Sequence, residues 1–84
     1  MKNQELYDIF TAKTTDIPPE DIYYQRLGRI LHEMRIQQGV TPQQIHNDIG
    51  ITPDELRRYE DGVSEITIYN LLLLLSYIEH NTDK

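Results

Sequence analysis

The residues of this chain that could do chemistry are three histidines and a pair of adjacent carboxylates. His32, His46 and His80 lie far apart in the sequence, so packed or half-exposed imidazoles are favoured over a metal site. Asp54 and Glu55 could form an acid–base pair, but they directly follow a helix start, where the helix dipole favours carboxylates. No glycine-rich phosphate loop, H-E-x-x-H motif or nucleophile elbow is present. We therefore expect neither an enzyme nor a cofactor.

Length and composition limit the classes of protein to which the chain can belong. Its 84 residues suffice for one small domain, and the absence of cysteine excludes disulfides and thiolate metal sites. The longest aliphatic run, residues 71–75, is far too short to cross a membrane, and the N-terminus lacks the basic and then apolar order of a signal peptide. We expect a cytoplasmic protein with no membrane partner.

Two helix starts within residues 41–62 organise the chain. Thr41 and Gln44 have the spacing of a capping box, and Thr52 and Glu55 repeat it eleven residues later; a proline follows each threonine at the first helical position. Gly50 lies between them, directly after an apolar residue, and supplies the positive φ that a chain reversal needs. This pattern predicts two short helices joined by a tight turn.

Two longer helices are expected around this pair. The first follows a proline pair and ends before Gly39, and the last begins after Thr67, a typical capping residue. Each carries apolar residues at helical spacing, which predicts one shared core. These residues are Ile22, Leu27, Ile30, Leu31 and Met34 in the first helix, and Ile68, Leu71, Leu74, Leu75 and Ile78 in the last. The fold class expected is all-α.

The order helix, G-I-T turn, helix and Y-E-x-G resembles the helix-turn-helix of the Cro-like, phage-repressor (XRE) DNA-binding domains. The resemblance covers residues 27–78 and is most specific in the L-G…M-R-I-Q-Q-G-V-T stretch, the turn and Tyr59-Glu60-x-Gly62, all at the family's spacing. It implies a small lambda-repressor-like five-helix bundle over residues 19–80. An N-terminal helical extension and linker (residues 1–18) would precede this bundle, and a short frayed tail (residues 81–84) would follow it.

The resemblance also implies a site and a function. It implies a partly buried ion pair between Arg35 and Glu60, and a DNA-binding transcriptional regulator that reads the major groove of double-stranded DNA with the helix around residues 53–60. Hydroxyls and free backbone N–H groups at the two helix starts would contact phosphate, and an arginine would contact guanine O6 and N7. The implied DNA-facing residues are Thr41, Gln43, Thr52, Asp54, Arg57 and Arg58.

Departures from the family pattern keep a second function open. Residues 41–62 contain five acidic and two basic side chains, and the whole chain, with 8 basic and 14 acidic residues, has a net charge of −6. Pro42 and Pro53 replace polar residues of the family, and His46 replaces a small residue at the helix crossing, so it must widen the crossing or rotate outward. The alternative is a repressor-like domain that has lost DNA binding and acts as a protein–protein interaction module or as the antagonist of a regulator.

Two groups of apolar residues exceed what one core requires. Leu6, Ile9 and Phe10 share one face of the short N-terminal helix, which must bury that face against something. Leu72 and Leu73 fall outside the core stripe of the last helix. These five residues could form the surface of a homodimer or bind another protein. Alternatively, the N-terminal helix is an extra piece of cover for the core, and the extension folds back over the two leucines of the last helix.

Overall fold

The computed structural model describes residues 4–81, and this part of the chain is all-helical, as the sequence predicts. The α-helices in it are α1 (Gln4–Thr11), α2 (Glu20–Gln37), α3 (Pro42–Ile49), α4 (Pro53–Glu60) and α5 (Ile68–His80), with a 3-10 turn, η1 (Thr14–Asp16), after α1. Because α1 belongs to the extension, four of these helices lie within residues 19–80; the segment between α4 and α5 is irregular. None of the described helices is long and apolar enough to cross a membrane.

The two ends of the predicted domain organisation reach beyond the described part. Residues 1–3 of the extension and residues 82–84 of the predicted tail lie outside it. Asn81, the first residue of that tail, is half-buried, and its Nδ2 donates a hydrogen bond to the Gln38 carbonyl oxygen at 3.3 Å. Asn81 is therefore attached to the bundle, because the end of α5 lies beside the end of α2.

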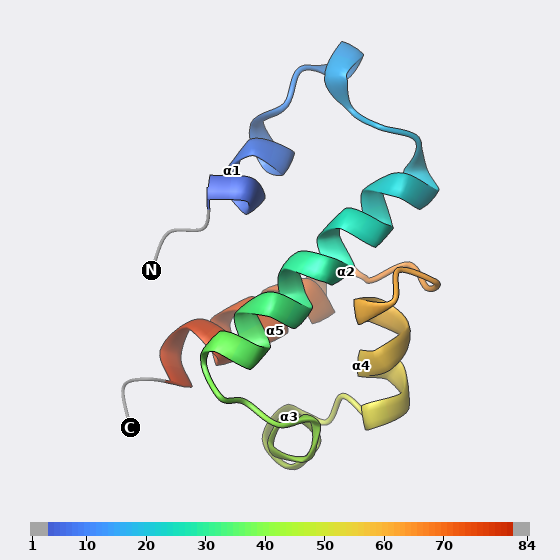
Figure 1. Ribbon diagram of the computed structural model, residues 1–84. Coiled ribbons are helices and arrows are strands. Elements are labelled where there is room, and N and C mark those ends of the chain that lie inside the picture. The colour runs from blue at the N-terminus through green and yellow to red at the C-terminus, as the bar shows by residue number, and fades with distance from the viewer. Residues whose placement is uncertain (1–3, 82–84) are drawn as a thin grey trace.

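The core forms on two sides of α2, which runs through the middle of the molecule (Figure 1). The larger cluster joins α2 to the three helices that follow it, and the smaller one joins α2 to α1 and α5. Burial of these aliphatic side chains is the main force that holds the short helices together, since none of them would be stable alone. The larger cluster contains Leu27, Leu31, Val40, Ile45, Ile51, Leu56 and Leu74; the smaller contains Ile9, Ile30, Met34 and Ile78.

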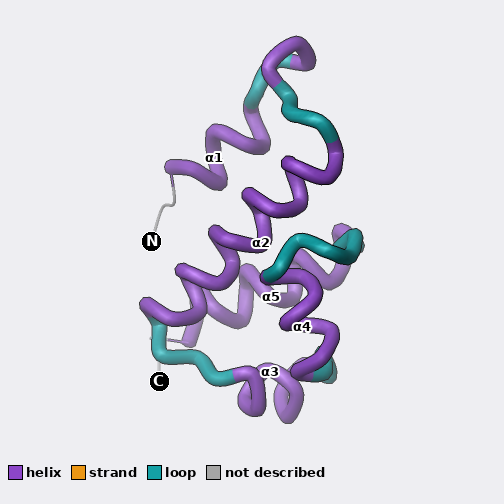
Figure 2. The backbone as a smooth tube through the Cα atoms, turned by 45° about the vertical axis from the view of Figure 1, so that its right-hand side comes forward, coloured by secondary structure: helices purple, strands orange, loops and turns teal. Residues whose placement is uncertain are grey.

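α1 folds back beside α2 (Figures 1 and 2). Ile9 is only 8% exposed, and Leu6 packs against both clusters. Arg29 on α2 forms an ion pair with Glu5 at 2.5 Å, and this bond keeps the pKa of the Glu5 carboxyl below its ordinary value. The prediction of a partner surface is therefore corrected for Leu6 and Ile9, which cover the chain's own core, while Phe10 remains exposed.

The last helix leaves apolar side chains uncovered at its start. Ile68 is 78% exposed, although its spacing places it in the core stripe, because Ile66 before the helix and Leu71 pack against the core instead. Leu72 is 60% exposed, so the extension does not cover it, and Leu73 is half-buried. An uncovered apolar surface is therefore present, but it begins earlier in α5 than the sequence suggests.

Candidate nucleic-acid interface

Both predicted helix starts are formed by complete capping boxes. The Gln44 N–H donates to Thr41 Oγ1 at 3.1 Å, and the Thr41 N–H donates to Gln44 Oε1 at 2.8 Å. At the start of α4 the Glu55 N–H donates to Thr52 Oγ1 at 3.1 Å, and the Thr52 N–H donates to Glu55 Oε1 at 3.4 Å. Since each box satisfies two backbone donors that a helix start would otherwise leave open, both starts are well defined.

The turn between these helices reverses the chain as predicted. Gly50 has φ of 80°, in the left-handed region that favours glycine, and its N–H donates to the His46 carbonyl oxygen at 3.1 Å. Ile51 then enters the core, which holds the turn against the bundle. Figure 1 shows α3 down its axis and α4 across the view, so the two helices cross. His46 is exposed: the imidazole rotates outward at this crossing.

The capping boxes determine which hydrogen-bond donors of Thr41 and Thr52 remain available to a ligand. Both backbone N–H groups are used within the boxes, which corrects the expectation that they are free to contact phosphate. The Thr52 hydroxyl also donates to Glu55 Oε1 at 3.2 Å, whereas the Thr41 hydroxyl accepts its capping bond and can still donate. Gln43 Nε2 donates to Asn47 Oδ1 at 3.0 Å within α3. The N–H groups of Thr41 and Thr52 are therefore not available for phosphate.

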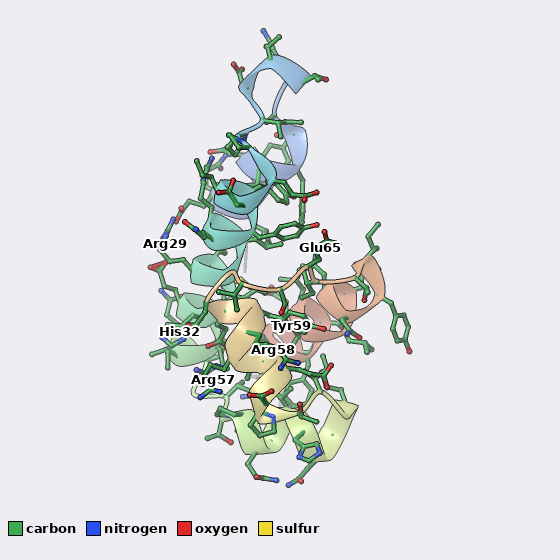
Figure 3. All side chains as sticks on the ribbon, turned by 90° about the vertical axis from the view of Figure 1, so that its right-hand side faces the viewer. Arg29, His32, Arg57, Arg58, Tyr59 and Glu65 are labelled. Carbon is green, nitrogen blue, oxygen red and sulfur yellow. The ribbon has the colours of Figure 1, made fainter. Side chains whose placement is uncertain are left out.

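Arg57 and Arg58 project from the outer face of α4 (Figure 3), where their side chains are 72% and 48% exposed. Each is bound to a different oxygen of one carboxylate. Arg57 Nη2 donates to Asp54 Oδ1 at 2.9 Å, and Arg58 Nη1 donates to Asp54 Oδ2 at 2.6 Å. The structure thus brings together three of the six predicted DNA-facing residues, two cations and the anion between them.

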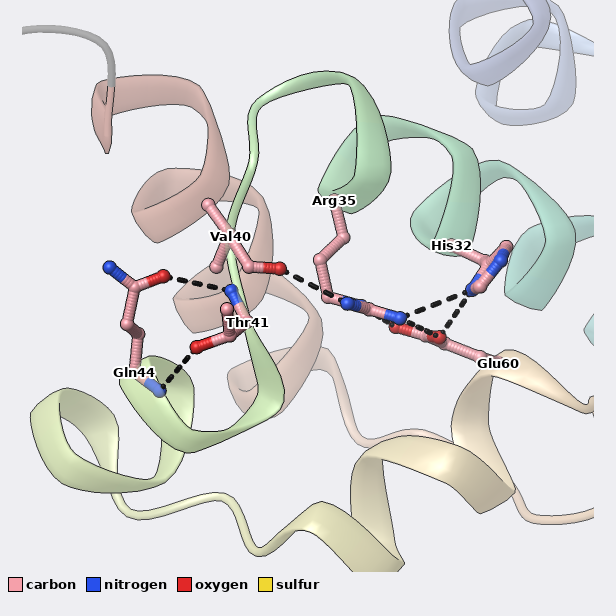
Figure 4. A network of polar contacts seen from close by, with 6 residues as sticks. All are labelled: His32, Arg35, Val40, Thr41, Gln44 and Glu60. Carbon is pink, nitrogen blue, oxygen red and sulfur yellow. Dashed lines mark hydrogen bonds and ion pairs between the residues drawn. The ribbon is translucent and has the colours of Figure 1, made fainter.

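The ion pair implied between Arg35 and Glu60 is present and nearly buried, with the two side chains 10% and 9% exposed. Arg35 Nε donates to Glu60 Oε2 at 2.7 Å and Nη2 to Oε1 at 3.1 Å, while Nη1 donates to the Val40 carbonyl oxygen at 3.0 Å (Figure 4). Arg35 thus joins the end of α4 to α2 and to the segment before α3. Its role is to hold α4 in place, and each of the three guanidinium nitrogens donates a hydrogen bond.

His32 belongs to the same network, which the sequence did not indicate. Its Nδ1 lies 2.7 Å from Glu60 Oε1, and with a proton on Nδ1 the imidazole donates to this carboxylate (Figure 4). The available signal was its spacing from Arg35, because residues three apart share one helix face. Among residues 4–81, no group of three or more histidine, aspartate or glutamate side chains is arranged to hold a metal ion.

An open groove of about 490 Å³ lies beside this network, bounded by α2 and by the starts of α3 and α4. Pro42 and Pro53 line it at the two helix starts, Arg57 and Asp54 line its outer side, and Arg35 and Glu60 lie on the α2 side. Neither proline has an N–H group to donate, and the charged side chains that line the groove include three carboxylates and two guanidiniums, those of Asp54, Glu60, Asp61, Arg35 and Arg57. Arg57 is the exposed arginine of this lining, whereas Arg35 is nearly buried and bonded to Glu60.

A crossed pair of short helices on a small all-helical bundle defines this chain as a helix-turn-helix domain. It is similar to two curated bacterial proteins, each named an uncharacterized HTH-type transcriptional regulator. The one from Rickettsia conorii is 26% identical over 57 residues, which cover 68% of this chain and 46% of the relative. The one from Rickettsia prowazekii is 26% identical over 57 residues, which cover 68% of this chain and 44% of the relative.

The chain thus spans less than half the length of these curated relatives. No protein-family model matches it. No solved structure matches it at a significant level.

Proposed function

We propose that this chain is a DNA-binding transcriptional regulator of the XRE helix-turn-helix type, which inserts the start of α4 into the major groove. The observation that carries the proposal is the pair of exposed guanidiniums of Arg57 and Arg58 on the outer face of α4. An arginine in this position can donate two hydrogen bonds to guanine O6 and N7. The Arg35–Glu60 ion pair, which holds α4 rigidly on α2, and the names of the Rickettsia relatives also support it.

The net charge of −6 weakens the attraction to DNA but does not remove it. Only the docking face must be positive, because charges farther away than about 10 Å are screened at about 0.1 M salt. Asp54 and Glu55 lie at the tip of α4, but Glu55 is directed back into its capping box, which leaves Asp54 as the acidic group beside the arginines. With Glu55 also charged, the two arginines and two carboxylates of α4 near this tip sum to about zero.

We expect the protein to bind random duplex DNA at low salt, with micromolar affinity that falls steeply as salt is added, because each phosphate contact releases counterions. Fluorescence anisotropy with a labelled duplex at about 50 mM salt measures this directly. On a preferred site, Arg57→Ala and Arg58→Ala should each weaken binding by roughly 5- to 150-fold, the value of one bidentate guanine contact.

Arg26→Ala is the matched control for these two variants. Arg26 is an exposed arginine on α2, so its loss changes the net charge equally without touching α4. A wild-type protein that binds no duplex at low salt contradicts the proposed function. Affinity that falls equally in all three variants would contradict the assignment of Arg57 and Arg58 to base contacts.

A second candidate function, a protein-binding module or the antagonist of a regulator, is favoured by the uncovered apolar surface of α5. We define the α5 patch as Ile68, Tyr69 and Leu72, all of them exposed and within the first five residues of α5. Contiguous apolar surface of this kind marks interaction sites. The same patch could pair two copies of this chain around a two-fold axis, which would present two α4 helices to successive grooves, so that a homodimer serves the first function as well.

We expect the chain to be a dimer at about 100 µM and Leu72→Gln to weaken the dimer at least about tenfold, because one buried leucine contributes about 1.5 kcal/mol or more in each copy. Multi-angle light scattering across a dilution series measures this change. The matched control is Ile36→Gln, since Ile36 on α2 is 57% exposed, nearly as much as Leu72, and lies outside the patch. A wild-type monomer, or equal weakening by both variants, would contradict dimerisation through the α5 patch.

A further inference from the structure

Building on the proposed function, we propose that Asp54 is a specificity-determining residue of α4. Its carboxylate forms ion pairs with Arg57 and Arg58 and repels the phosphates of DNA. The two arginines therefore become fully available to DNA only where a G·C pair replaces these ion pairs. Guanine then accepts from an arginine, and the amino group of cytosine donates to the freed carboxylate. Asp54 thereby suppresses binding to random DNA and favours sites with G·C at the start of α4.

The geometry allows one carboxylate to control two cations. Asp54 is the second residue of α4, one turn before Arg57 and Arg58, and each of its oxygens accepts from one of them at 2.9 and 2.6 Å. The positive end of the helix dipole stabilises a carboxylate at this position, so its charge stays at the tip of the helix. The three side chains together carry one net positive charge instead of two.

The ion pairs of Asp54 are weak enough for a base to replace them, but replacing them with a phosphate contact gains little free energy. An exposed ion pair changes an equilibrium by at most about fivefold, so a DNA group can displace it. A phosphate oxygen offers the arginine an anion similar to the carboxylate that it gives up, and it brings the phosphate charge next to Asp54. A guanine edge instead offers two neutral acceptors, which separate the right base from a wrong one by roughly 5- to 150-fold.

The freed carboxylate then has a partner of its own in the major groove. Aspartate accepts a hydrogen bond from cytosine N4, and guanine and cytosine belong to the same base pair, so an arginine and Asp54 can read the two bases of one G·C pair or of neighbouring pairs. Asp54 can contact the same base pair as Arg57 or Arg58, because residues three and four apart lie on one face of a helix. The substitution Asp54→Asn keeps the size of the side chain but removes its charge.

The test compares the wild type with Asp54→Asn and Asp21→Asn by fluorescence anisotropy. Asp21 is an exposed aspartate at the second position of α2, so its variant matches residue type, helix position and change in net charge, away from the arginines. The probes are a random duplex and a duplex that the wild type selects from a randomised pool. Both are measured at about 50 and 200 mM salt, and circular dichroism confirms that each variant is folded.

We expect Asp54→Asn, relative to Asp21→Asn, to bind the random duplex about tenfold more tightly at the lower salt concentration. This advantage should shrink about threefold at the higher one, since one additional phosphate contact steepens the salt dependence by about 0.9. The preference for the selected duplex over the random one should fall at least about fivefold.

Equal gains in Asp54→Asn and Asp21→Asn, with the preference for the selected duplex unchanged, would overturn the role of Asp54 while leaving the DNA-binding function in place. Failure of all three proteins to bind either duplex at about 50 mM salt would instead overturn the proposed function, and this inference with it.

Discussion

Replacing Gly28 with alanine is expected to destabilise the protein by about 3 kcal/mol or more, although alanine is the better helix former by about 1 kcal/mol. A Cβ atom at this position would lie 2.3 Å from the Tyr59 carbonyl oxygen and 2.6 Å from that of Glu60. Both are backbone atoms at the end of α4, so they can move only if the helix moves. Thermal unfolding followed by circular dichroism should show a midpoint roughly 12–24 °C below the wild type.

Gly39→Ala is the control for this substitution. Gly39, unlike Gly28, has a positive φ of 69°, and a Cβ there would meet nothing within 4 Å, so the variant reports backbone strain alone, about 1–2 kcal/mol. If Gly28→Ala melts at or above the temperature of the wild type, the close contact between α2 and α4 is not present in solution. Since that contact supports α4, the same variant should also bind DNA more weakly than the wild type when both are folded.

Breaking the Arg35–Glu60 ion pair from either side is expected to have an effect of similar size. Arg35→Ala leaves the nearly buried Glu60 carboxylate without its cation, and Glu60→Ala leaves the guanidinium without its anion, so each should lower the free energy of unfolding by about 3–5 kcal/mol. The loss should be partial in Arg35→Lys, because an ammonium cannot bond both carboxylate oxygens and the Val40 carbonyl in the same planar geometry. Urea denaturation measures all three variants.

A double substitution distinguishes the cost of leaving one charge buried and unpaired from the net contribution of the ion pair to stability. In Arg35→Met with Glu60→Leu neither charge remains buried, and we expect this variant to be more stable than either single alanine variant. Single variants that each cost less than about 1 kcal/mol would show that the pair is solvated and does not hold α4 against α2. The exposed Arg29–Glu33 pair, with both side chains about half exposed, is the control that should give such a small effect.

Local patterns in the sequence predicted the helix boundaries of the candidate site well. Thr41 and Thr52 form the capping boxes that their spacing indicates, and Gly50 adopts the positive φ that the turn requires. These features depend on residues within one turn of each other, so the sequence contains all the information they need. The same local spacing also places Asp54 within reach of both arginines, because residues three and four apart share one helix face.

Contacts between distant segments were less predictable. The sequence left open whether the N-terminal helix covers the core or binds a partner, and the bundle decided this by burying Ile9 beside Ile78. Helical spacing placed Ile68 in the core, but the path of the chain before α5 brings Ile66 there instead. His32 joins Glu60 only because α2 and α4 cross closely at Gly28.

The sequence by itself therefore determined the all-α class, the two capped helix starts and the turn between them, because capping and backbone geometry act within a few residues. Only the tertiary structure decided which apolar side chains remain on the surface and which polar groups are already engaged. Burial and ion pairing depend on where segments far apart in the chain meet, and that placement results from packing of the whole core.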